Sequence, residues 1–338
     1  MTASPHKRVV FQALVCSAAF LFLYVSAKGA GRPGGPDASL YGLLLLFVVC
    51  TVAGQAVLLL PRVPPLAGMI VAGVVLRNVG AINGLPSAWM GVLKGCAEAV
   101  IFLRAGMGLD FQILKQSGSM FFGLAIVPGL VEASVAATVA MRVFKSYNLG
   151  VGWGFMLGFV LSDVSPAVTV PILLDFILKG YGARNGVPTI LLAAGGLNGI
   201  ISITAFGICE SFVFSTGQAV WLTCVLGIVQ IIGGLFLGIA AGITVAWVWD
   251  WAPSQSQSQS ELWRFLLVLL LSGVGIFLGK YLSMGGGGTL AVITMGVVMK
   301  IKLQHRMAPL ETRFKEAWAS VGQTLLFGLL GAQVKKSG

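Results

Sequence analysis

Charged residues and histidines are scarce in this sequence. Only 10% of its 338 residues are Asp, Glu, Lys or Arg, whereas soluble domains usually carry about 25% charged residues. So little charge excludes an ordinary water-soluble fold, because its helices would be apolar on every side. The two histidines, His6 and His305, are far apart along the chain and so give no support to a Ser-His catalytic pair or a metal site.

Cysteine spacing gives no sign of a metal site or a disulfide framework either. The five cysteines are odd in number, lie inside apolar stretches and lack the spacing of metal ligands, so we interpret them as small apolar residues. They are Cys16, Cys50, Cys96, Cys209 and Cys224. We therefore expect no catalytic residues, no metal, no cofactor and no enzyme activity.

Lysine and arginine are in excess, but they are dispersed. The formal net charge is +11, and the basic residues are scattered among the segments between apolar runs, so we expect no nucleic-acid partner. The positive-inside rule explains them better and favours a cytoplasmic N-terminus, without naming a particular membrane. The richest loop contains Lys300, Lys302, Arg306, Arg313 and Lys315.

Long apolar stretches fill most of the chain. Hydrophobic residues make up 57% of it, and a helix that crosses a bilayer needs about 20 residues. The spans must be helices, because backbone groups in hydrocarbon need partners within their own segment. We therefore predict an all-α polytopic membrane protein with about eleven transmembrane helices in a lipid bilayer. They are expected near 9–27, 38–60, 64–81, 89–113, 118–143, 150–178, 187–214, 218–248, 261–283, 287–300 and 316–334.

Two segments stand apart from this regular pattern. The first apolar stretch follows Lys7 and Arg8, so it is either a transmembrane helix or a cleaved signal peptide, although no clean cleavage site precedes Gly31. The Ser-Gln repeat at about 252–261 predicts a flexible loop. Because the other connections are short, we expect a single transmembrane domain over 1–338.

Ionisable residues within the apolar stretches are the first candidates for function, since each is costly at membrane depth. Lys94 and Glu98 stand four residues apart, one helical turn, so they can neutralise each other on one face. Arg104 and Glu132 lie on consecutive long spans and can pair across the helix interface. We interpret all four as members of structural ion pairs.

The stretch GFVLSDVSPAVTVP at 158–171 places polar residues in the middle of an apolar span. Pro166 removes an amide donor and disfavours helix in the residue before it, so we expect a broken helix near 162–166. Transporters use such breaks to build ion sites at mid-membrane depth, whereas many other helices contain a simple proline kink. We favour an ion site that includes Asp163, Ser165 and Thr169.

The next span contains the run AAGGLNGI, in which Gly195 and Gly199 have the G-x-x-x-G spacing that permits close helix packing. Asn198 is the amide side chain of this run, and it can serve either as an ion-site residue or as a hydrogen-bonding contact between helices. The glycine spacing is a weak signal by itself. It recurs at Gly154 and Gly158 and at Gly234 and Gly238.

Five segments in the same order carry a resemblance to a known family. They are PPLAGMIVAGVVLRN (64–78), FLRAGMGLD (102–110), GFVLSDVSPAVTVP (158–171), GVPTILLAAG (186–195) and FSTG (214–217). From about Gly42 to its C-terminus, the sequence resembles the sodium/proton exchanger (NHA) branch of the monovalent cation:proton antiporter superfamily. The resemblance implies an NhaA-like inverted-repeat fold with crossing broken helices, a homodimer, and exchange of Na⁺ or Li⁺ for protons by elevator-like alternating access. Its first-repeat core would cover about 89–214, and a partial second repeat about 261–338.

The sequence departs from this family at two places. The family carries two adjacent aspartates where this chain has Asn198 and Gly199, while Asp163 stands where a small neutral residue is expected. An amide cannot take up and release protons near neutral pH, so we hypothesise that Asp163 supplies the lost carboxylate. The second repeat also looks truncated, because three spans follow FLRAGMGLD and none follows the similar LFGLLGAQV near the C-terminus.

Two functions from different classes follow from these features. One is a secondary active transporter that exchanges Na⁺, Li⁺ or K⁺ for protons, with Na⁺ as the foremost substrate and Asp163, Ser165, Thr169 and Asn198 lining its site. The other is a non-transporting homologue that serves as a structural or regulatory partner of an intact exchanger. The retained broken helix favours the first, and the missing pair of aspartates favours the second.

Overall fold

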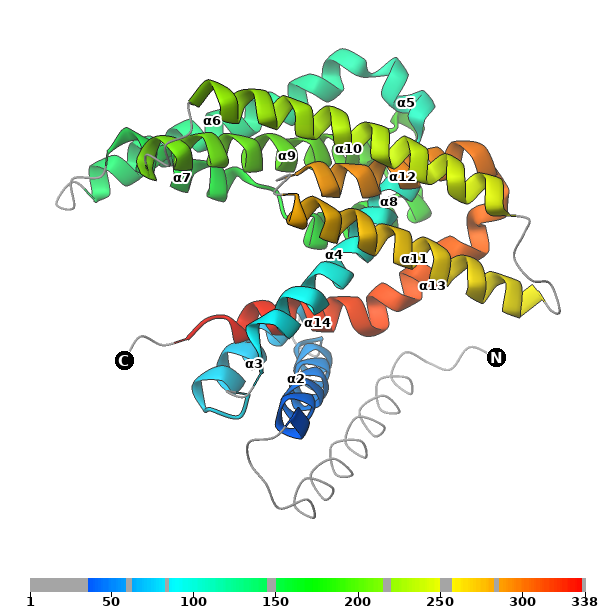
Figure 1. Cartoon of the computed structure of the whole chain (residues 1–338), viewed down its shortest axis with the longest axis horizontal. Helices are drawn as coiled ribbons and strands as arrows, with labels where there is room; N and C mark the ends of the chain where they lie inside the picture. Colours follow the sequence, from blue (N-terminus) through cyan, green and yellow to red (C-terminus); the bar gives the residue numbers. More distant parts are fainter. Residues whose placement is uncertain are drawn as a thin grey trace. The chain divides into compact units, whose positions relative to one another are not determined.

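A computed structural model describes residues 36–58, 63–82, 85–144, 150–214, 220–249, 257–282 and 286–335. Within these ranges the regular structure is entirely helical (Figure 1). The chain divides into two compact units, one of which takes in the described residues up to Ala97 together with those from Glu316 onwards. The other unit is Glu98–Lys315. The single transmembrane domain expected over 1–338 stays a prediction, because two packed units can belong to one transporter domain.

The smaller unit is built on close contacts between helices that are distant in the sequence. Helix α14 packs on α3 and on α2, and glycine makes this approach possible. A side chain at Gly73 would meet the backbone at Gly328, and one at Gly331 would meet the backbone of Ile70. Its elements are α2 (Pro36–Val57), α3 (Pro65–Asn78), the first part of α4 (Ser87–Gly108), the π-helical turn η5 (Trp318–Gly322) and α14 (Gln323–Ala332).

The larger unit contains the predicted broken span and the helices around it. In it α6 packs on α7, both pack on α9, and α10 and α11 pack mainly on α12 (Figure 1). Its elements are the rest of α4, α5 (Phe111–Gln116), α6 (Gly118–Val143), α7 (Val151–Ser162), α8 (Pro166–Lys179), η2 (Ala183–Asn185), α9 (Val187–Phe214), α10 (Val220–Val248), α11 (Gln257–Tyr281), α12 (Gly287–Leu303), η4 (Gln304–Met307) and α13 (Ala308–Ala317).

Helix α6 shows how composition sets the two faces of a membrane helix. Small residues at every fourth position form a buried stripe, on which α7 and α9 pack. The stripe is Ala125, Gly129, Ala133 and Ala137. Valines at every fourth position are more than half exposed, and this apolar face suits contact with hydrocarbon. They are Val127, Val131, Val135 and Val139.

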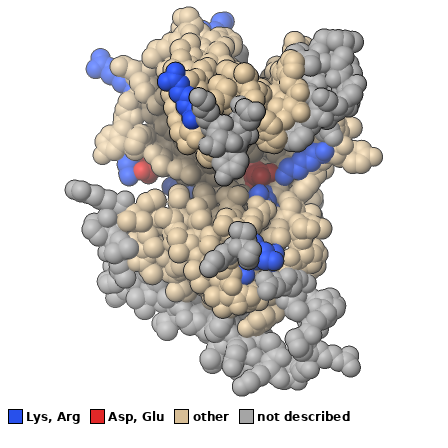
Figure 2. Space-filling view, turned by 90° about the vertical axis from the view of Figure 1, so that its left-hand side faces the viewer, with Lys and Arg blue, Asp and Glu red and all other residues tan. Residues whose placement is uncertain are grey.

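Five helical segments among the described residues are long and apolar enough to cross a membrane. They are Gly118–Val143, Val151–Lys179, Val187–Glu210, Ile228–Val248 and Gln259–Tyr281, and Tyr41–Val57 and Pro65–Asn78 are shorter apolar helices. Figure 2 shows a face on which isolated Lys and Arg side chains interrupt a mostly uncharged surface. The chain is thus a polytopic helical membrane protein, while the count of eleven spans stays a prediction.

Two expected segments lie wholly or partly outside the described residues. The first apolar stretch, near 9–27, lies outside them, as do residues 252–256 of the expected flexible loop. The last residues of that loop are helical, because α11 already begins at Gln257. Glutamine and glutamate are good helix formers, so the end of the Ser-Gln repeat extends α11 instead of remaining irregular.

The structure gives the expected ion pairs other partners. Glu98 pairs with Lys280 of α11 at 2.8 Å, and Lys94 donates a hydrogen bond of 3.3 Å to the Gln333 side chain. The prediction that Lys94 and Glu98 neutralise each other was therefore wrong, because each reaches a helix that is distant in the sequence. Arg104 is buried and Glu132 is exposed, and no ion pair joins them within the described part of the chain.

Close packing at Gly195 was also predicted wrongly. A side chain added at Gly195 would meet open space, whereas one at Gly158 would collide with the backbone of Ala133 on α6. Along α10, Gly234 and Gly238 likewise lie against the backbone of α12. The same spacing occurs on all three helices. A glycine is required only where the backbone of a neighbouring helix lies against it, and the spacing does not show where that is.

We predict that Gly158→Ala destabilises the contact between α6 and α7. The new methyl group would lie 3.2 Å from the Cα of Ala133 and closer still to its carbonyl oxygen, and such overpacking typically costs about 1–3 kcal/mol. Denaturant or thermal unfolding of the purified protein in detergent measures the change. Gly123→Ala on α6 is the matched control, because nothing lies within 4 Å of that position. Equal stability of the two variants would contradict the packing described here.

Candidate functional site

The predicted break lies inside the span Val151–Lys179. Helix α7 ends at Ser162, and α8 begins at Pro166. Between them Asp163 is extended, with φ −73° and ψ 116°, and so is Ser165, with φ −63° and ψ 110°. Pro166 accounts for the extended conformation of Ser165, because its ring disfavours the helical conformation in the preceding residue while suiting the first turn of a new helix. The broken helix expected near 162–166 is thus confirmed.

A break within a span leaves carbonyl groups at the end of α7 without helical partners. Two side chains satisfy them. The Ser162 hydroxyl donates a hydrogen bond of 3.3 Å to the carbonyl oxygen of Phe159. The amide Nδ2 of Asn198 on α9 donates a hydrogen bond of 3.0 Å to the carbonyl oxygen of Ser162. Asn198 therefore ties α9 to the end of the broken helix.

The Oδ1 atom of the Asn198 amide lies against Gly129 of α6, where there is no side chain. A side chain at Gly129 on α6 would collide with the Oδ1 atom of Asn198. Asn198 is only 6% exposed, so its amide is enclosed between α6 and the end of α7. This arrangement makes Asn198 primarily a contact that positions three helices.

Asp163 lies on the side of the break that faces Gly199. Its Oδ1 atom would be 3.1 Å from a Cβ atom built at Gly199. The Asp163 residue is exposed, and it forms no ion pair with a basic residue of the described ranges. Position 199 has no side chain of its own, so the carboxyl group of Asp163 is the acidic group at this point of α9.

The two hydroxyl residues expected at the site differ in their use. The Thr169 hydroxyl donates a hydrogen bond of 3.1 Å to the carbonyl oxygen of Ser165, which also accepts the backbone amides of Val168 and Thr169. Ser165 itself is exposed, and its side chain forms no capping hydrogen bond with α8. Ser165 thus leaves its hydroxyl at the break, while Thr169 stabilises the first turn of α8.

Ser162 belongs to the predicted break, whereas Gly129 and Ser202 were not predicted. Ser162 supplies the accepting carbonyl group, and Gly129 makes room for the Asn198 amide. Ser202 is buried and lies one helical turn beyond Asn198 on α9. Residues four apart share one face of a helix, so the sequence alone could have placed Ser202 beside Asn198. The role of Gly129 has no local signal, because it depends on which helix lies opposite.

The helix ends give the break a polarity of its own. The C-terminal end of α7 carries a partial negative charge, and the N-terminal end of α8 carries a partial positive charge. Asp163 follows directly on the negative end. A carboxylate beside the negative end of a helix attracts a cation and offers it the oxygen atoms that hard cations prefer.

We predict that Asn198→Ala destabilises the protein. The substitution removes the donor to the Ser162 carbonyl oxygen, and an unsatisfied buried backbone group costs about 1–3 kcal/mol. Thermal unfolding in detergent measures the effect. Asn185→Ala in η2 is the matched control, because that asparagine is exposed. If both variants unfolded at the same temperature, the described role of Asn198 would be wrong.

Comparison with known proteins agrees with this membrane architecture. The model of the family described as "Sodium/hydrogen exchanger, transmembrane" matches residues 43–337. Sodium/hydrogen exchanger 9B2 from Homo sapiens is 35% identical over 309 residues, which cover 88% of this chain and 56% of that protein. Sodium/hydrogen exchanger 9B1 from Homo sapiens is 33% identical over 315 residues, which cover 91% of this chain and 59% of that protein.

A third relative matches a shorter stretch more closely. Sodium/hydrogen exchanger 9B1 from Mus musculus is 38% identical over 193 residues, or 55% of this chain and 34% of that protein. The chain spans little more than half the length of the human relatives. The family match itself covers most of the chain, and its apolar helices are those of an integral membrane protein. The chain therefore belongs to the sodium/hydrogen exchanger family.

Proposed function

We propose that this protein exchanges a monovalent cation, Na⁺ foremost, for protons across a membrane, with Asp163 as the carboxylate that binds each in turn. Membership of the sodium/hydrogen exchanger family supports the reaction. The observation that carries the site is the position of the Asp163 carboxyl group beside Gly199. It lies against the part of α9 where the family carries an aspartate that this chain lacks.

Exchange requires a group that can hold a proton or a cation, but not both. A carboxyl group meets this condition, because its protonated form is neutral and its ionised form attracts a cation. The Asn198 amide has no ionised form, and Gly199 has no side chain. Asp163 is therefore the group at the break that can couple the two movements.

The neighbours of Asp163 can complete a cation site. The Ser165 hydroxyl at the break is a candidate oxygen ligand, and Thr169 can add an oxygen lone pair while it donates to the Ser165 carbonyl group. Asn198 contributes indirectly, because its amide holds the C-terminal end of α7 beside α9. In this proposal Asp163 supplies the negative charge, and the break between α7 and α8 positions the oxygen ligands.

We further propose that the cation crosses by alternating access within an NhaA-like inverted-repeat fold, and that the protein acts as a homodimer. The broken helix α7–α8 supports the first proposal, because such discontinuous spans place ion sites near mid-membrane depth in secondary transporters. The resemblance of the sequence to the sodium/proton exchanger (NHA) branch supports the fold and the homodimer.

A second function is supported by Asn198 itself. Its amide is enclosed by backbone on both sides, so the position has become a structural contact without an ionisable group. A protein with this substitution could support an intact exchanger as a structural or regulatory partner without transporting ions. Measurement of transport by the purified protein separates the two functions.

We predict that Asp163→Asn abolishes cation-dependent proton movement. Proteoliposomes with a fluorescent pH indicator measure it on addition of Na⁺, Li⁺ or K⁺, and the variant should match empty liposomes. The matched control is Asp175→Asn on the same span, which removes an exposed ion pair with Lys179 at 2.6 Å and should leave exchange intact. Persistent exchange in Asp163→Asn would rule out Asp163, and its absence in the unaltered protein would favour the partner function.

We predict that moving the carboxylate to α9 restores exchange. In the background Asp163→Asn, the further change Gly199→Asp places a carboxyl group within about one hydrogen-bond length of its original position. Cation-dependent proton flux should reappear above that of the single variant, which matches empty liposomes. Gly195→Asp in the same background is the control, because it lies one turn away, about 6 Å along the axis. Equal rescue by both positions would contradict a defined site.

A further inference from the structure

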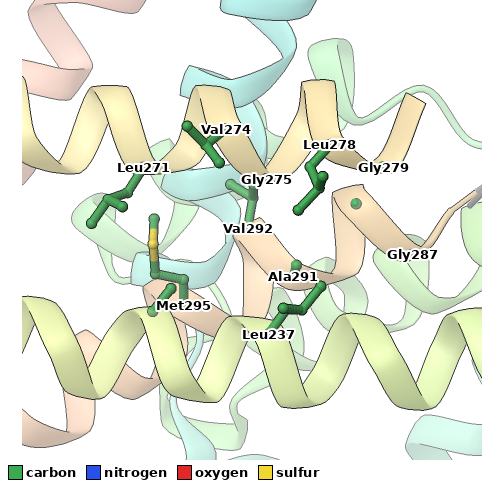
Figure 3. A pocket seen from close by; sticks show the side chains of 12 residues that line it. Leu237, Leu271, Val274, Gly275, Leu278, Gly279, Gly287, Ala291, Val292 and Met295 are labelled. Atoms are coloured by element: carbon green, nitrogen blue, oxygen red, sulfur yellow. The ribbon is translucent and has the colours of Figure 1, made fainter. Parts of the chain in front are cut away.

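An apolar cavity lies between three helices of the larger unit, and no residue of the broken helix lines it. Its volume is about 110 Å³, and Figure 3 shows it bounded by α10 and α11, with residues of α12 between them. Its lining consists of leucine, valine, methionine, alanine and glycine residues. A water molecule inside a protein makes about three hydrogen bonds, so this lining does not suit water.

Glycine residues create the cavity by letting α12 come close to both of its neighbours. A side chain at Gly279 of α11 would lie 2.6 Å from the Cα atom of Gly288, and one at Gly238 of α10 would collide with the carbonyl oxygen of Ala291. Helices α10 and α11 pack mainly on α12 and little on each other. The floor of the cavity is therefore formed by small residues of α12. Larger side chains of α10 and α11 stand on either side, where Leu237 is 46% exposed and Val274 58%.

The cavity extends along α11 for most of the depth of one leaflet. Its lining on this helix runs from Leu271 to Gly279, eight residues apart, or about 12 Å along the helix axis. Half of a hydrocarbon core is about 15 Å thick. The span of α11 is Gln259–Tyr281, so the lining begins at the middle of the span. It ends close to Tyr281, which is exposed and of a residue type enriched at the level of lipid head groups.

The basic residue at the outer end of the cavity is already neutralised. Lys280 follows Gly279 directly, and its ammonium group pairs with Glu98 at 2.8 Å. The same Nζ atom lies 5.9 Å from the ring centroid of Phe277. We therefore expect a ligand of this cavity to be recognised by its hydrocarbon part and not by a charge.

We propose that the cavity binds one acyl chain of a phospholipid from the surrounding bilayer, whatever the head group, with the glycerol end near Gly279 and the chain end near Leu271. An empty cavity would deprive its lining of dispersion contacts. An apolar cavity of about 150 Å³ in another protein binds benzene, so a cavity of this size has room for a hydrocarbon segment. A flexible chain suits a cavity that is small in volume and extends for most of one leaflet. The bound chain contacts α10, α11 and α12 together, and so joins two helices that touch each other little.

Photolabelling of the full chain in proteoliposomes tests this proposal. The probe is a phosphatidylcholine with a diazirine near the end of one acyl chain, and mass spectrometry maps its adducts. It should label Leu271 and Met295 more strongly than the exposed valines of α6, which report ordinary lipid contact. A probe with the diazirine near the glycerol group should label Leu278 instead. Labelling of the lining no stronger than that of α6 would show ordinary bilayer contact or cover by another protein surface, and would overturn the proposal.

Variants that fill the cavity should remove the label. Ala291→Leu and, independently, Ala241→Leu each place a larger side chain in the lining, so each variant should lose the adducts at Leu271 while keeping those on α6. Ala240→Leu is the matched control, because Ala240 is exposed and lies outside the lining. It should be labelled like the unaltered protein. Unchanged labelling of Leu271 in both filled variants would overturn the proposal.

Competition in detergent solution tests the role of the chain without any variant. Dioleoyl phosphatidylglycerol and dioleoyl phosphatidylcholine should reduce the labelling of Leu271 equally, and dihexanoyl phosphatidylcholine should not reduce it. Stronger competition by phosphatidylglycerol would show that a head group is recognised, and equal competition by the short lipid would contradict a chain that reaches the middle of the span. Native mass spectrometry then identifies the bound species by its mass, and a free fatty acid alone would overturn the assignment to a phospholipid.

Discussion

Backbone carbonyl groups at the end of α7 have no helical partners, and inside a membrane each one needs a donor from elsewhere. The hydrogen bond from Asn198 to the Ser162 carbonyl oxygen meets this constraint, and the positions of the surrounding groups depend on it. It fixes α9 beside the break, where Asp163 comes to lie against Gly199. Gly129 permits it, because any larger residue there would displace the Asn198 amide. The break, the hydrogen bond that satisfies its carbonyl group and the Asp163 carboxyl group thus depend on one another.

Compared with the aspartate that the family resemblance implies at this position, Asn198 has two consequences that act in opposite directions. It removes an ionisable group from α9, and it gains an N–H donor that a carboxylate lacks. The added N–H donor stabilises the end of the broken helix. The loss of the ionisable group would end ion coupling if no other carboxylate were present. Asp163 lies within contact distance of the neighbouring position on α9. The account proposed above is that the acidic group has moved across the interface, from α9 to the break.

Much of this arrangement could be predicted from the sequence where the cause is local. Pro166 fixes the break by excluding helix from the preceding residue, and no distant contact is needed for that. The apolar character of the long helices likewise follows from composition alone. The hypothesis that Asp163 supplies the lost carboxylate came from the family resemblance and stays a proposal, for which the short distance from Asp163 to position 199 is the structural support.

Other features could not be predicted, because they depend on helices that are distant in the sequence. Glu98 pairs with Lys280, which lies 182 residues further along the chain, so spacing within α4 gave the wrong partner. The glycine spacing that marks Gly195 also marks Gly158, but only the latter faces a neighbouring backbone. A helical period shows which residues share a face, and it carries no information about which helix covers that face.

The central claim is that one carboxyl group, Asp163, binds a proton and a cation in competition. Addition of Na⁺ to the purified protein in weakly buffered detergent solution tests this directly, since a bound cation must displace the proton. The account predicts a proton release that saturates with Na⁺ concentration and is absent in Asp163→Asn, while Asp175→Asn retains it. Equal proton release by the unaltered protein and Asp163→Asn would contradict the account.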